Sequence, residues 1–239
     1  MKYLIIACLL IVNQHAYTQA ESGMESGIFR LERGTFDSHQ NMIGRKIPPA
    51  EAKGDYYLDS EWHQGTFTLK YGRSSAEYPL RYDVENAVLE IQWGNMVKVA
   101  GEEYLASFRW SDEEGEKLFL NAGEFAYKGT ALAGFVELVY QGEDSLLLKT
   151  DAYLKQADYV EGLDMGSRHP EIIMNQKFLV VHEGEAFDIN RRKDFLNYAD
   201  DVPAKVLKRY IQKENINLKE ASDLSVLMGY YESLKNKRK

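Results

Sequence analysis

The chain has 239 residues, of which 28% are charged and 44% hydrophobic, and its formal net charge is -8 at pH 7. This acidic balance argues against nucleic-acid binding and against docking on anionic lipid, because both require a basic surface. The single cysteine, Cys8, lies in an N-terminal apolar run, so the rest of the chain is stabilised by its core without disulfides.

Residues 1–20 have the features of a secretory signal peptide. Lys2 supplies a positive charge, the apolar run Leu4–Val12 follows, and small residues precede an expected cleavage site after Ala20. These nine apolar residues span about 14 Å of helix, which is too short for a membrane anchor. A lipoprotein signal is the alternative, but a lipidated cysteine ends the apolar region and Cys8 lies in its middle. We therefore expect export to the periplasm, the outer membrane or the medium, with no membrane-spanning segment after cleavage.

The next part of the chain predicts a lead-in followed by a long β region. Residues 21–55, rich in Gly, Ser, Glu and Lys, predict a mobile lead-in with one early strand at 28–31. Residues 56–189 carry short segments of alternating apolar and polar residues, each closed by a turn, as half-buried strands do. They predict an antiparallel meander in the form of a curled sheet, partial barrel or sandwich. The expected strands cover residues 67–71, 80–84, 87–93, 97–99, 104–110, 118–120, 135–140, 146–153 and 178–187.

Residues 190–239 follow a different period, with apolar residues three and four positions apart, and predict three short helices. Asn190 is expected to cap the first helix, Pro203 to begin the second and Asn217 to cap the third. Each helix has one apolar stripe, so we expect the helical segment to pack on the β domain at 56–189. The predicted fold class is therefore α+β, mainly β.

The strongest candidate for chemistry in the sequence is His182, together with Glu185 and the upstream His169. Imidazole and carboxylate groups are the ligands of zinc and mixed metal sites. A plain hairpin turn is the competing interpretation, because His182 and the adjacent Glu183 point to opposite faces of a strand. The chain has no helical H-E-x-x-H, no G-x-S-x-G elbow and no Gly-rich phosphate loop, so we predict no catalytic residue and no cofactor.

Aromatic residues are abundant, with sixteen Tyr, ten Phe and three Trp. They either fill the core of the sheet or line a curled sheet that binds a sugar or an apolar ligand. The doublets Tyr56-Tyr57 and Tyr230-Tyr231 direct their two members to different sides, so we expect one member of each doublet to be exposed. These four tyrosines are the predicted contacts to a protein partner in the cell envelope.

Three motifs stand out in the β and helical regions. The chain carries a G-x-F-x-L core at Gly65–Leu69, the segment Pro79–Val84, and Tyr210-Ile211 followed by Tyr230-Tyr231. In these motifs it resembles exported proteins of unknown function that are common in Bacteroidetes-type bacteria. The resemblance implies export and one continuous β-plus-helix unit, and it brings no catalytic motif.

These observations favour a non-enzymatic binding or interaction module in the cell envelope or outside the cell. Two alternatives remain from the sequence. The first is a binder of a small apolar or sugar ligand inside a curled sheet, and the second is a hydrolase that depends on His182. The oligomeric state is left open.

Overall fold

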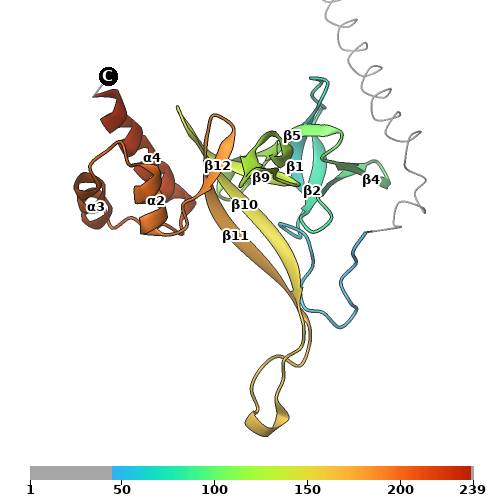
Figure 1. Ribbon diagram of the computed structural model, residues 1–239. Coiled ribbons are helices and arrows are strands. Elements are labelled where there is room, and N and C mark those ends of the chain that lie inside the picture. The colour runs from blue at the N-terminus through green and yellow to red at the C-terminus, as the bar shows by residue number, and fades with distance from the viewer. Residues whose placement is uncertain (1–44, 238–239) are drawn as a thin grey trace, which may run out of the picture. The chain divides into compact units, whose positions relative to one another are not determined.

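The computed structural model describes residues 45–237, so the expected signal peptide and early strand lie outside the described residues. Within this range a sheet of twelve strands is followed by three helices (Figure 1). All strand pairs but one are antiparallel, which confirms the predicted α+β, mainly β fold class. None of the helices in this range has the length and apolar content that crossing a membrane requires.

The strands follow the local alternation of apolar and polar residues. In β1 (His63–Leu69), Phe67 and Leu69 are buried, and the intervening Thr66 and Thr68 are half-buried. The other strands are β2 (Tyr78–Asp83), β3 (Val88–Trp93), β4 (Met96–Gly101), β5 (Leu105–Asp112), β6 (Gly115–Asn121), β7 (Ala126–Tyr127), β8 (Thr130–Ala131), β9 (Phe135–Gln141), β10 (Ser145–Lys155), β11 (Glu171–His182) and β12 (Glu185–Asp188).

The sheet is largely a meander, because short turns connect most consecutive strands. Its strand order is β4-β3-β2-β1-β5-β6-β9-β10-β11-β12-β7-β8. The short hairpin β7–β8 interrupts the chain between β6 and β9, and β7 pairs in parallel with β12. This parallel pair has no sequence signal, since a strand of two residues is too short to show an alternating pattern.

Aromatic rings fill the interior of the curled sheet around Phe108. The ring of Phe108 stacks on Phe119 at a centroid distance of 4.6 Å, and Phe135 meets it edge-on at 5.1 Å. The rings of Trp110 and Tyr82 complete the cluster, with centroids 5.3 and 5.5 Å from the centroid of the Phe108 ring. The Tyr82 hydroxyl accepts a hydrogen bond from the backbone N–H of Phe135, which satisfies a polar atom inside this core. This part of the sheet interior is a close-packed core formed by ring-to-ring contact.

The three helices are α2 (Arg192–Tyr198), α3 (Ala204–Lys213) and α4 (Ala221–Asn236). Their apolar stripes bury a second core against β10 and β11. It includes Leu146, Phe178 and Val180 from the strands and Phe195, Leu207, Ile211, Leu224, Leu227, Met228 and Tyr231 from the helices.

Two helix starts differ from the prediction. The Asn190 side chain accepts a hydrogen bond from the backbone N–H of Phe178 at 2.7 Å, and it therefore fastens β11 instead of capping α2. Helix α4 begins after Glu220, and the backbone N–H of Asn217 donates to the carboxylate of Asp223 at 2.7 Å. Asn190 therefore acts on a residue far away in sequence, which local spacing does not reveal, whereas the Asn217 side chain accepts a hydrogen bond from the backbone N–H of Lys219 at 3.1 Å in the turn that precedes α4.

The longest hairpin of the sheet is formed by β10 and β11, which pair without a break over all eleven residues of β10. β9 pairs with β10 as far as Leu148, and β12 pairs with β11 only from Leu179 onward. The rest of the hairpin extends beyond both neighbouring strands (Figure 1). At about 3.3 Å per residue, the eleven residues of β10 span about 35 Å.

The sequence does not predict the start of β11, because apolar and polar residues do not alternate over 171–176.

Part of the expected lead-in is tied to the far end of this hairpin. The backbone N–H of Lys53 donates to the Pro170 carbonyl, and the N–H of Ile172 donates to the Lys53 carbonyl, each at 2.9 Å. These bonds add a short third segment beside β11, so residues near Lys53 belong to the folded β region.

Candidate binding groove on the C-terminal helices

The C-terminal helical segment has the opposite charge to the rest of the chain. Residues 190–239 contain twelve Lys and Arg against seven Asp and Glu, a net charge of +5, whereas residues 1–189 carry -13. The imbalance is concentrated in α3, whose four basic residues have no acidic residue among them. The exclusion of anionic partners, which rested on the net charge of the chain, therefore does not extend to this surface.

Three cations of α3 lie along one side of the helix. Lys205, Arg209 and Lys213 are four residues apart, so neighbouring like charges on this side of the helix repel one another. The Lys213 ammonium lies 2.6 Å from Glu214 Oε1, and this hydrogen bond raises its pKa. Among the residues that the structure describes, Lys205 and Arg209 form no ion pair. Both are therefore available to a bound anion.

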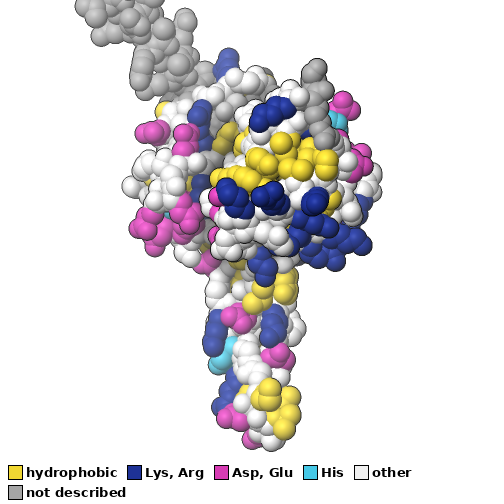
Figure 2. All heavy atoms as spheres, turned by 90° about the vertical axis from the view of Figure 1, so that its left-hand side faces the viewer, with side chains coloured by type: hydrophobic (Ala, Val, Ile, Leu, Met, Phe, Trp, Pro, Cys, Tyr) yellow, Lys and Arg dark blue, Asp and Glu magenta, His cyan; other side chains and the backbone are white. Residues whose placement is uncertain are grey.

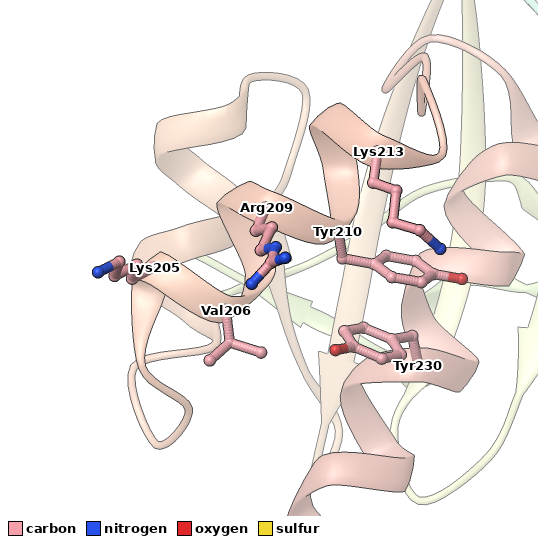
Figure 3. A pocket seen from close by; sticks show the side chains of 6 residues that line it. All are labelled: Lys205, Val206, Arg209, Tyr210, Lys213 and Tyr230. Atoms are coloured by element: carbon pink, nitrogen blue, oxygen red, sulfur yellow. The ribbon is translucent and has the colours of Figure 1, made fainter.

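Two tyrosines form a stack beside these cations. Tyr210 of α3 and Tyr230 of α4 lie with ring centroids 3.7 Å apart and an interplanar angle of 8°. Their hydroxyls point in opposite directions (Figure 3). Because their centroids are only 3.7 Å apart, the rings lie almost directly face to face, whereas aromatic pairs generally prefer offset or edge-to-face geometry. Both rings are half-buried.

The cations and the tyrosines surround one open pocket of about 520 Å³. We call this surface the α3–α4 groove; it is lined by Lys205, Val206, Arg209, Tyr210, Lys213 and Tyr230 (Figure 3). On the helical side of the molecule, hydrophobic side chains form a band bordered by Lys and Arg (Figure 2). The groove therefore offers positive charge and apolar surface together, which suits a ligand that carries both acidic and apolar groups.

A second cluster of titratable groups surrounds Asp144, in the turn between β9 and β10. The fully buried Asp144 carboxylate lies 2.6 Å from His182 Nδ1 and 3.5 Å from Lys235 Nζ, and it accepts a hydrogen bond from Tyr198. Burial alone raises the pKa of this carboxyl, but the hydrogen bonds from Tyr198 and His182 and the Lys235 charge outweigh burial and lower it. Because the partners belong to β11, α2 and α4, Asp144 fastens two helices to the sheet.

His182 also faces a pocket of about 460 Å³. A histidine oriented by a carboxylate is the arrangement that a general base requires. The residues that line this pocket with His182 include no Ser, Thr or Cys: they are Phe187, Asp188, Asp194, Asn197, Tyr198 and Asp200. The contacts of Asp144 with His182, Tyr198 and Lys235 assign this cluster to the attachment of the helices. No protein-family model, curated protein or solved structure matches this chain.

The three residues predicted as metal ligands are not brought together. His169 precedes β11 and His182 ends it, so the length of the strand, about 40 Å, separates them. Glu185 pairs with His182 across the β11–β12 turn, which leaves two of the three residues near each other. Within residues 45–237, no group of three His, Cys, Asp or Glu side chains is placed to hold a metal ion.

Two of the four predicted interaction residues are buried, and their prediction as partner contacts is corrected. Tyr56 and Tyr231 are only 7% and 3% exposed because both pack into cores. Tyr57 is half-buried beneath the guanidinium of Arg81, which lies 3.7 Å from its ring centroid. Tyr230 is the one member of the set that lines the α3–α4 groove.

Sequence reasoning selected Tyr230 but missed the rest of the groove. The signal that was available is the charge of α3 together with the four-residue spacing of its cations. The second signal is the contrast between a basic helical segment and an acidic β region. The contact of Tyr210 with Tyr230 depends on how α3 packs on α4, and neither helix indicates it alone.

Proposed function

We propose that this chain is an exported, non-enzymatic binding module whose α3–α4 groove holds an acidic segment of a protein partner. The observation that supports this proposal most directly is the groove, which three cations of α3 line together with Val206 and two stacked tyrosines. A purely anionic ligand leaves the apolar surface unused, and a purely apolar ligand leaves the cations unpaired. A segment in which carboxylates alternate with apolar side chains satisfies both.

The expected affinity is modest and depends on salt. Exposed ion pairs contribute about 0.2–1 kcal/mol each, so three of them do not hold a partner by themselves. Apolar burial against Val206 and the tyrosines adds about 25 cal/mol per Å². Because the cations are exposed to solvent, salt at about 0.5 M screens their contribution within a few ångströms.

Fluorescence anisotropy with three labelled peptides tests the proposal. In the first peptide glutamate alternates with leucine, and in the other two glutamine or lysine takes the place of glutamate. We expect the glutamate peptide to bind, the glutamine peptide to bind about tenfold more weakly and the lysine peptide not to bind. Equal affinity for the glutamate and lysine peptides would show that the groove does not select acidic partners.

A pair of matched variants locates the binding site. Arg209→Glu reverses a groove charge and is expected to weaken the glutamate peptide about tenfold. Lys70→Glu makes the same charge change at an exposed turn after β1 and is expected to bind as wild type does. If both variants bind alike, the peptide binds elsewhere or responds only to net charge.

A further inference from the structure

The end of the β10–β11 hairpin carries apolar side chains that no core explains. Between the two strands the chain forms a short 3-10 helix, Glu161–Leu163. Val160, Leu163 and Met165 in and beside it are 50%, 69% and 65% exposed. Hydrophobic side chains gather at this end of the projecting hairpin (Figure 2). A cluster of this kind marks an interaction surface, and we call residues 160–165 the hairpin tip.

The hairpin tip is also acidic. Glu161 and Asp164 alternate with its apolar side chains, and residues 156–169 carry a net charge of -2. Asp164 lies 3.6 Å from Arg168, but its side chain is 85% exposed. Glu161 is exposed and forms no ion pair with the described part of the chain. The tip therefore combines the same two properties, negative charge and apolar surface, that the α3–α4 groove requires of a ligand.

We propose that the hairpin tip of one copy docks in the α3–α4 groove of a second copy, so that the chain assembles head to tail. This inference rests on the proposed function and names the partner of the groove. The two carboxylates of the tip meet the cations of α3, and its three apolar side chains meet Val206 and the tyrosine stack.

The contact forms between copies because a tip cannot reach the groove of its own chain. Helix α4 is attached at the opposite end of the hairpin, where Glu232 accepts a hydrogen bond from the backbone N–H of Asp144 at 3.1 Å. The tip follows Lys155, about 35 Å further along β10. The unbroken pairing of β10 with β11 holds the tip at that distance.

The symmetry of the contact follows from its two different halves. A tip–groove contact is heterologous, so each bound copy still offers one unoccupied tip or groove, and the assembly continues as a chain or closes as a ring. Each contact involves one loop and one shallow groove, which places its buried area below the roughly 1,200 Å² of a stable interface. We therefore expect association at high protein concentration and low salt.

Sedimentation velocity of the full chain tests the inference. Between about 10 and 500 µM at about 20 mM NaCl, the weight-average mass is expected to rise well above that of the monomer, and about 0.5 M NaCl is expected to reverse the rise. A groove variant, Arg209→Glu, and a tip variant, Leu163→Ser with Met165→Ser, are each expected to remain monomeric. All three side chains are exposed, so the fold is retained. Lys70→Glu is expected to associate as wild type does.

Mixing the two defective variants gives the most specific outcome. The groove variant retains an intact tip and the tip variant retains an intact groove, so one contact can form and assembly stops at a 1:1 dimer. Monomeric wild-type protein over the whole concentration range, or a mixture that stays monomeric, would overturn the inference. If the glutamate peptide still binds to a monomeric wild type, the groove function stands with a different partner. If it does not bind either, both proposals fail.

Discussion

Replacing Asp144 measures how firmly the helices are attached to the sheet. Asp144→Ala removes the buried partner of the Tyr198 hydroxyl and of Lys235, which is 13% exposed and keeps only the more exposed Glu143 at 3.5 Å. Removing one member of a buried ion pair costs about 3–5 kcal/mol of stability. His182 is half-exposed and can bind water in place of the lost carboxylate, so we expect a loss at the low end of this range, about 3 kcal/mol. Asp144→Asn keeps an acceptor of the same shape and is expected to cost about 1–2 kcal/mol.

Urea unfolding of the full chain provides the measurement, with an unchanged m-value as the sign that only stability has changed. Glu113→Ala removes an exposed acidic side chain between β5 and β6 and is the matched control, with an expected change within about 0.5 kcal/mol. If Asp144→Ala costs no more than this control, Asp144 does not fasten the helices.

The pH dependence of stability follows from the same carboxyl. Because the pKa of Asp144 is lower in the folded chain than the unfolded value of about 3.9, the stabilisation is fully present above that value. It is lost as the pH falls through the folded pKa. The difference in unfolding free energy between wild type and Asp144→Asn should therefore shrink from about pH 5 to about pH 2. Parallel stability curves for the two proteins would refute this reasoning.

Two further substitutions test the packing of the sheet. A β-carbon at Gly65 would overlap the backbone carbonyl oxygen of Arg109 on the neighbouring strand, so Gly65→Ala is expected to cost about 1–3 kcal/mol in urea unfolding. Gly162→Ala is the control, because nothing lies near the added carbon there, and it should change stability by less than about 0.5 kcal/mol. If Gly65→Ala and Gly162→Ala change stability equally, the close approach of β1 to β5 is not supported. Phe108→Ala removes the ring at the centre of the aromatic core and should cost about 3–5 kcal/mol; a loss below about 1 kcal/mol would mean that the cluster is loosely packed.

The parts of the fold that could be predicted are those specified by neighbouring residues. The alternation of Phe67 and Leu69 with threonines fixes both the presence of β1 and its buried face. The start of β11 lacks such alternation, because residues 171–176 lie on the projecting part of the hairpin and do not face a large core. Asn190 looked like a helix cap because its nearest alternative partner, Phe178, is twelve residues away in sequence.

The candidate site was less predictable, because its contacts join distant residues. The charge of α3 is visible in the sequence, but the net charge of the whole chain concealed it. Tyr230 was selected as a member of a doublet, whereas its position in the groove results from stacking on Tyr210, twenty residues earlier. His182 was considered with its neighbours in sequence, while its actual partner Asp144 lies 38 residues away.

The unbroken pairing of β10 with β11 has a mechanical consequence. The hydrogen bonds that hold this hairpin in the sheet join β10 to β9 and β11 to β12, and they lie perpendicular to the direction in which the hairpin extends. A load applied at the tip and opposed at the helices runs along the strands, so it acts on these bonds in shear. Several bonds must then break together, whereas a pull across the strands would open them one after another. Tension between linked copies would therefore pass along the hairpin to the helical end without separating the strands of the sheet one by one.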